Sequence, residues 1–156
     1  MELRRVVTGH DANGKAIVLI DEIVKNAGSA RPGATASVIW TTEGFPIDND
    51  GGEDTSGRRT GTTLPNGTVF RVVEFAPGVS PRNHRTDSID YAVVISGEID
   101  MALDEQTVHL KAGDVLVQRG TIHNWKNNGT QPCAIAFALI DAKPVTAGGK
   151  TLHAEG

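Results

Sequence analysis

Cysteine, aromatic residues and long apolar runs are all scarce in this sequence of 156 residues. The lone cysteine, Cys133, cannot form a disulfide within the chain, and its apolar surroundings predict a buried, inert thiol. The opening residues, MELRRVVTGHDANG, lack the apolar stretch of a secretory signal. From these absences we expect a cytoplasmic protein.

An excess of positive charge is also absent. Lys and Arg number 15 and Asp and Glu number 19, so the formal net charge is −4 and the pI is about 5.7. Without a basic face, we expect no nucleic-acid partner. No segment approaches the roughly 18 consecutive apolar residues of a membrane-spanning helix, so we expect no membrane partner. The partner we expect is a small-molecule substrate, bound by a single domain.

Stretches with apolar residues at helical spacing are missing too, whereas 18 glycines and 7 prolines punctuate short runs. This pattern predicts an all-β fold of short strands and tight turns. Residues 3–7 and 15–20 flank the turn-rich residues 10–14, and together they predict an N-terminal β-hairpin. Residues 37–41 predict a further strand.

Residues 42–66 are too polar to build a core. Loops of this length in compact domains serve as lids or binding loops, or they are mobile segments without function. Both alternatives stay open at this point. We expect N-terminal strands and this loop over residues 1–66, a barrel over residues 67–141, and a polar tail over residues 142–156.

Strand-length runs separated by turn residues fill the second half of the chain. Ile99, Met101 and Leu103 alternate with polar side chains, which predicts a strand with one buried face. Residues 92–95 and 134–139 are apolar throughout, which predicts strands covered on both faces. Such strands require two stacked sheets or one closed sheet.

Two segments each place a histidine close to a glycine turn, and they resemble the two motifs of the cupin superfamily. The first motif-like segment keeps the family spacing at Gly78, His84 and Gly97. Asp90 stands where the family has glutamate, and Thr86 stands where it has a second histidine. The resemblance covers about a third of the chain.

The second segment keeps the opening Gly113 and the closing pair His123 and Asn127. Its turn before Gly120 is one residue shorter, and Arg119 replaces the motif's proline. The resemblance implies a double-stranded β-helix, or jelly-roll barrel, of two antiparallel sheets that holds a divalent metal ion, with the N-terminal hairpin as an extension. Small cupins commonly pair by exchanging edge strands, so the resemblance also implies a homodimer to which the hairpin and the tail contribute.

Two imidazoles and one carboxylate form a ligand set that suits iron, manganese, zinc or nickel. His84, His123 and Asp90 supply that set, and Asp87 is an alternative carboxylate. Thr86 is a poor ligand for these ions, so it leaves a position open to water or substrate. The alternative is a cupin without a metal, in which both histidines are hydrogen-bonded pocket residues.

Four residues are candidates for substrate binding: Thr86, Arg71, Arg119 and Trp125. By strand alternation Trp125 shares the face of His123, as a cavity wall or as plain core. Arg119 either pairs with a substrate carboxylate or lies solvated on the surface. Arg71 interrupts an apolar run, so it lies either on the wet face or in the pocket, paired with an acid.

These residues predict a metal-dependent enzyme of the lyase, decarboxylase or isomerase type that acts on a small organic acid or carbonyl metabolite. The ion would polarise the substrate and stabilise an enolate-like state, while Asp87 or Tyr91 carries the proton. One alternative is a ferrous-iron oxygenase, because the same ligands suit iron. Another is a non-catalytic module that binds a small molecule.

Overall fold

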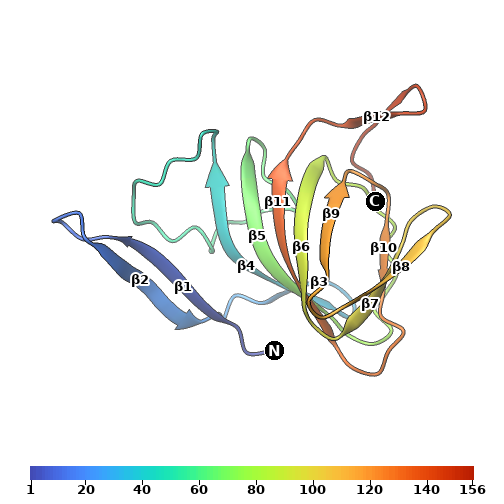
Figure 1. Cartoon of the computed structure of the whole chain (residues 1–156), viewed down its shortest axis with the longest axis horizontal. Coiled ribbons are helices and arrows are strands. Elements are labelled where there is room, and N and C mark those ends of the chain that lie inside the picture. Colours follow the sequence, from blue (N-terminus) through green and yellow to red (C-terminus); the bar gives the residue numbers. More distant parts are fainter.

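The chain folds into antiparallel strands that build two sheets and two separate hairpins (Figure 1). The computed structural model describes residues 1–156, except for the side chain of Ala30. Thirteen strands are present, and no helix occurs in the described chain. Accordingly, the described residues include no helix of the length and apolarity needed to cross a membrane. The all-β prediction is confirmed.

A six-stranded sheet forms one side of the barrel, in the strand order β3-β4-β5-β11-β6-β9. Its strands are β3 (Gly28–Arg31), β4 (Ala34–Glu43), β5 (Gly67–Phe75), β6 (Ser88–Ser96), β9 (Val115–Arg119) and β11 (Cys133–Asp141). The second sheet has three strands in the order β10-β7-β8. They are β7 (Glu98–Ala102), β8 (Thr107–Lys111) and β10 (Asn124–Lys126).

One apolar core joins the two sheets. Val69, Ile135 and Phe137 of the large sheet lie in the same buried cluster as Ile99 and Met101 of β7. Removal of these side chains from water drives the two sheets together. The burial of Ile99 and Met101 also confirms the strand with one buried face that their alternation predicted.

Strand alternation decides which side chains of the large sheet enter the barrel. On β6, Ser88, Asp90 and Ala92 are buried, whereas Tyr91 and Val93 are exposed. Successive side chains of a strand point to opposite faces. The first half of the strand therefore carries the polar groups of Ser88 and Asp90 into the barrel, whereas Val93 lies on its outside.

The N-terminal hairpin projects from the barrel, as Figure 1 shows. It consists of β1 (Arg4–His10) and β2 (Ala16–Ile23), so the predicted hairpin is confirmed. Arg5 is 4% exposed and donates hydrogen bonds to the Asp54 carboxylate at 2.7 and 2.9 Å and to the Ile39 carbonyl at 3.1 Å. These contacts connect the hairpin to the barrel, because β1 and β2 form a sheet of their own.

The outer face of the large sheet is apolar and exposed, so the prediction that residues 92–95 are covered on both faces is wrong. Val93 is 45% exposed, Ile95 is 42% exposed and Val117 of β9 is 58% exposed. A continuous apolar run does not by itself distinguish two-sided burial from an uncovered outer face. Residues 134–139 are buried or half-buried, because β11 lies in the middle of the sheet.

We expect this exposed apolar face to associate with a second copy of the chain. The projecting hairpin also exposes apolar side chains, since Val6 is 50%, Val18 is 57% and Leu19 is 45% exposed. Exposed apolar patches often mark interaction surfaces.

Light scattering on the protein as it elutes from a size-exclusion column is therefore expected to give the mass of a dimer. The double substitution Val93→Lys with Val117→Lys is expected to give a monomer with an unchanged circular dichroism spectrum, because both side chains point away from the core. A wild-type chain that stays monomeric at micromolar concentration would contradict this expectation.

The barrel extends beyond the residues predicted for it. Strands β3 and β4 belong to the six-stranded sheet, so the segment before residue 67 contributes to the barrel itself. The tail forms a hairpin of β12 (Val145–Ala147) and β13 (Lys150–Leu152). Beyond this hairpin, Arg85 and Glu155 exchange backbone hydrogen bonds of 2.9 and 3.0 Å, which dock the tail on its own barrel.

Candidate functional site

A cavity of about 810 Å³ lies within the barrel. It is lined by side chains of both sheets and by residues 58–62 of the long polar loop. The position of those residues favours the binding-loop alternative for residues 42–66. Six of the residues singled out in the sequence line the cavity: Arg71, His84, Thr86, Asp90, His123 and Trp125.

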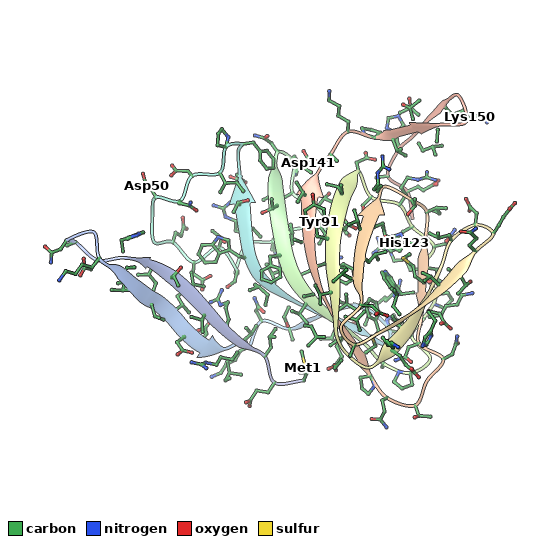
Figure 2. All side chains as sticks on the ribbon, in the orientation of Figure 1. Met1, Asp50, Tyr91, His123, Asp141 and Lys150 are labelled. Atoms are coloured by element: carbon green, nitrogen blue, oxygen red, sulfur yellow. The ribbon has the colours of Figure 1, made fainter. Side chains whose placement is uncertain are left out.

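The histidines of the two motifs lie side by side on the cavity wall, with His123 near β9 and β10 (Figure 2). The backbone amide of each donates to the carbonyl oxygen of the other at 3.0 Å, and the ring centroids are 4.2 Å apart. Nδ1 of His84 lies 3.1 Å from the Arg82 carbonyl oxygen, and Nδ1 of His123 lies 3.0 Å from that of Thr121. A carbonyl oxygen only accepts, so Nδ1 of His84 carries the proton and its Nε2 offers a lone pair. The His123 ring also faces the side-chain amide nitrogen of Gln118, which lies 2.9 Å from Nδ1 and 3.3 Å from Nε2.

Burial keeps both imidazoles neutral. His84 is 7% exposed and His123 is 3% exposed. Burial lowers the pKa of His84 to about 4, and the charges of His123, Arg82 and Arg31 add to the shift, whereas the hydrogen bond to the Arg82 carbonyl opposes it. Burial also lowers the pKa of His123, with smaller contributions from the same two arginines. At neutral pH the cavity wall therefore presents two unprotonated bases next to each other.

A hydrogen-bonded chain of three side chains lies on the same wall. The hydroxyl oxygens of Thr86 and Ser88 are 2.8 Å apart, and the Ser88 hydroxyl donates to the Asp90 carboxylate at 2.6 Å. All three residues are buried. Burial raises the pKa of Asp90, while the Ser88 hydrogen bond and the Arg71 guanidinium oppose the shift. These hydrogen bonds connect the buried Asp90 carboxyl group to the Thr86 hydroxyl group on the cavity wall.

The predicted metal site lacks a third protein ligand. Among the side chains that the structure describes, no group of three or more His, Cys, Asp or Glu residues is placed to hold one ion. The Asp90 carboxylate accepts the Ser88 hydrogen bond and interacts with the charge of Arg71, with which a cation would compete. Tetrahedral zinc sites take three or four protein ligands. His84 and His123 alone therefore do not fit the resident iron, manganese, zinc or nickel ion that the motifs imply.

Three residues predicted for the site lie away from the cavity. Tyr91 on β6 (Figure 2) is 51% exposed, and Arg119 at the end of β9 lines a separate surface pocket. Asp87 lies just before β6, its Oδ1 is buried, and the residue does not line the cavity. These positions contradict the proton-shuttle role of Asp87 and Tyr91 and the substrate contact of Arg119.

Two polar residues of the site were missed although the sequence carries a signal for them. Ser88 lies two positions before Asp90, so alternation places both on one face. Gln118 pairs in register with Asp90 across β6 and β9, and its side-chain amide contacts the His123 ring at 2.9 Å. Both belong to a continuous polar patch on the inner face of the sheet.

Two arginines of the cavity, Arg31 and Arg82, have no signal in the sequence. Arg31 ends β3, and Arg82 lies in the irregular segment before His84. Neither belongs to a periodic run, so only the course of the chain brings them together.

Cys133 is the inert thiol that the sequence predicts. Its exposed fraction is 0%, and burial raises its pKa to about 11, with the charge of Glu98 adding to the shift. The thiolate is the reactive form of cysteine. The residue therefore contributes no nucleophile at neutral pH.

Because the pKa of the Cys133 thiol is raised in the folded protein, the free energy of unfolding depends on pH in the alkaline range. Unfolding releases the thiol to its ordinary pKa, so the unfolded chain loses this proton before the folded chain does. The stabilising contribution is complete below pH 9 and is lost as the pH rises toward 11, by roughly 2 to 3 kcal/mol. Urea unfolding at pH 8 and at pH 11 checks this, with Cys133→Ala as the comparison. Between pH 8 and pH 11 we expect the unfolding free energy of Cys133→Ala to fall by less than that of the wild type. Equal falls in the two proteins would contradict the raised pKa of Cys133.

Comparison with known proteins identifies the family. The model for the family described as "Cupin domain" matches residues 71–139. The chain is 36% identical over 158 residues to the cupin-domain-containing oxidoreductase fogC of Aspergillus ruber (strain CBS 135680), covering 96% of this chain and 77% of that protein. It is also 36% identical over 157 residues to phomopsin biosynthesis cluster protein C' of Diaporthe leptostromiformis, covering 95% and 83%. The chain belongs to the cupin family.

A solved structure supports the same fold. The polyketide cyclase RemF from Streptomyces resistomycificus matches with a TM-score of 0.52 and 16% identity, over 84% of this chain and 78% of that chain. At this identity the likeness concerns the fold alone. The double-stranded β-helix predicted from the two motifs is confirmed.

Proposed function

We propose that this cupin is an enzyme that moves a proton on a small carbonyl-bearing acid, as an isomerase, a decarboxylase or another lyase. The observation that carries the proposal is the pair of buried, neutral imidazoles of His84 and His123 on the cavity wall. A neutral imidazole within reach of a substrate is an effective general base. The relatives named for biosynthesis clusters or as oxidoreductases support a role in small-molecule metabolism.

His123 is the general base of the pair. Burial is the largest cause of the lowered pKa of both rings, and the charge of His123 lowers the pKa of His84 further. The unprotonated ring nitrogen of His123 takes the proton from the carbon beside the substrate carbonyl, and the electron pair left behind forms an enolate.

The enolate oxygen needs positive charge or hydrogen-bond donors nearby. Arg71 on the cavity wall supplies a positive charge. The Thr86 hydroxyl donates to Ser88, because the Ser88 proton is given to Asp90. Return of the proton from His123 to a different carbon completes an isomerisation. An acid whose carboxylate lies β to the carbonyl can instead lose carbon dioxide. The electron pair of the broken carbon–carbon bond then forms an enolate, which takes a proton from water on carbon to complete a decarboxylation.

An anionic substrate also activates the base. Arg82 and Arg31 lower the pKa of both histidines. A carboxylate bound beside these guanidinium groups offsets their charge, so the pKa of His123 rises toward the working pH when substrate is present. Substrate binding thus makes His123 a stronger base.

The names of several relatives favour a second candidate, an oxidoreductase. Oxidation needs an electron acceptor as well as a base, and dioxygen with ferrous iron is the pair raised by the motif resemblance. Oxygen consumption, measured with and without added ferrous iron, distinguishes the two candidates. Iron-dependent uptake supports the oxidoreductase, and proton exchange without uptake supports the base mechanism.

Proton nuclear magnetic resonance in heavy water tests the proposal directly. We expect the protein to exchange the C3 protons of pyruvate, 2-oxobutyrate or phenylpyruvate, or to decarboxylate oxaloacetate, faster than buffer does. The activity is expected to survive dialysis against a chelator. No exchange or conversion of any of these acids, or activity that is lost with the chelator and restored by one metal, would contradict the proposal. Binding without turnover would support the non-catalytic module.

A further inference from the structure

We infer that the cavity recognises carboxylic acids with an apolar body, and that Arg31, Arg71 and Arg82 form the receptor for the carboxylate. The inference rests on the proposed function for its reaction but concerns recognition alone. It narrows the substrate from carbonyl metabolites in general to one chemical class.

The charge of the cavity is opposite to that of the chain. Five arginines line the cavity, Arg31, Arg58, Arg59, Arg71 and Arg82, and Asp90 is the one acidic residue on its described wall. The whole chain carries a formal net charge of −4. Positive charge is therefore concentrated at this site, where it attracts anions.

Arg71 lies deep in this wall without a complete set of partners. It shares the inward face of β5 with Val69, Val73 and Phe75, so strand alternation turns it into the barrel. Its Nε is buried and has no hydrogen-bond partner among the described residues. Asp90 is its acidic neighbour, but that carboxylate already accepts the Ser88 hydroxyl.

Arg31 has more buried nitrogen atoms without a hydrogen-bond partner than Arg71 has. Its Nε and Nη2 are both buried without a hydrogen-bond partner among the described residues, and its guanidinium carbon lies 6.0 Å from the centre of the Phe75 ring. The charge of Arg82 acts on both Arg31 and Arg71. Arg82 itself donates to the Gly156 carbonyl at 2.8 Å. Three guanidinium groups thus share a site that holds a single carboxylate.

Such an arrangement is costly unless an anion completes it. Buried donors without partners and neighbouring like charges both destabilise the empty site. A carboxylate accepts two parallel hydrogen bonds from a guanidinium and offsets the mutual repulsion. The donors left for a substrate carboxylate are Nε of Arg71 and Nε and Nη2 of Arg31.

The rest of the wall indicates what the carboxylate is attached to. Apolar side chains line the cavity beside the arginines, among them Val73, Phe75, Trp125, Phe137 and Leu139. Phosphate alone would leave this apolar wall and most of the 810 Å³ without a partner. An acid with an aliphatic or aromatic body fills both parts of the cavity.

Calorimetric titration with 3-phenylpropionate, its neutral amide, acetate and inorganic phosphate tests the inference. We expect 3-phenylpropionate to bind at least about tenfold more tightly than each of the other three. Arg71→Met is expected to lower this affinity at least about tenfold. Arg31→Gln provides a second test of the receptor if Arg71→Met fails to fold.

Arg119→Met is the matched control, because Arg119 is exposed and lies outside the cavity. Its affinity for 3-phenylpropionate is expected to equal that of the wild type. Equal binding of the acid and its amide, equal binding of phosphate, or wild-type affinity in both Arg71→Met and Arg31→Gln would overturn the inference. Tight binding of the acid without proton exchange would support the receptor and contradict the proposed reaction, so the two fail separately.

Discussion

Replacing His123 with glutamine is expected to lower the rate of proton exchange about 100-fold or more. Glutamine retains a polar side chain that can hydrogen-bond to Gln118 and to the Thr121 carbonyl, but it has no basic nitrogen. The binding of 3-phenylpropionate is expected to change little, because the charges of Arg31 and Arg71 remain. The rates are measured by nuclear magnetic resonance at saturating substrate, with circular dichroism to confirm folding.

His109→Gln provides the control for this experiment. The His109 side chain is 56% exposed on β8 and contacts Asp100 and Glu98 outside the cavity. We expect the wild-type exchange rate in this variant. A His123→Gln protein that folds, binds the acid and exchanges protons at the wild-type rate would show that His123 is not the base.

Replacing Gly97 with alanine is expected to lower the free energy of unfolding by about 2 to 5 kcal/mol. Gly97 has a φ of 73°, where L side chains are strained. A Cβ at this position would also meet the Pro132 carbonyl oxygen and would come within 2.9 Å of Cys133 Cα. Both atoms are backbone next to the central strand β11, which cannot shift without disturbing its two neighbours. Urea unfolding measures the loss.

Gly14→Ala separates the effect of the backbone conformation from the effect of the new Cβ's contact with the backbone of residues 132 and 133. Gly14 lies in the turn of the N-terminal hairpin with a φ of 74°, and a Cβ there would meet nothing within 4 Å. We expect a loss of about 1 to 2 kcal/mol from the backbone conformation alone. Equal losses in the two variants would mean that contact with β11 does not matter at Gly97.

The strands of the barrel were largely predictable because their pattern is local. Alternation placed Ile99 and Met101 on a buried face, and the turn residues 10–14 marked the N-terminal hairpin. The apolar run of residues 92–95 gave the wrong exposure, since whether an outer face is covered depends on what packs against it. Only the arrangement of the sheets decides that.

The candidate site was predictable where residues lie in motifs and unpredictable elsewhere. The two motif-like segments identified His84 and His123, and the fold brings them together. The same segments predicted roles for Tyr91 and Arg119 from their proximity in sequence to the histidines, but both side chains are exposed outside the cavity. The two-residue period of β6 places Tyr91 outward and Ser88 inward with Asp90.

By itself, the sequence determined the all-β class, the cupin motifs, the hairpin and the pair of histidines, because strand periodicity, turn chemistry and motif spacing act over short stretches of chain. Only the tertiary structure decided that Asp90 interacts with Arg71 and Ser88 rather than completing a metal site. It also decided that Arg31 and Arg82 share one cavity with them. These residues come from separate strands and loops, and their electrostatics depend on distance and burial, which the order of residues along the chain does not specify.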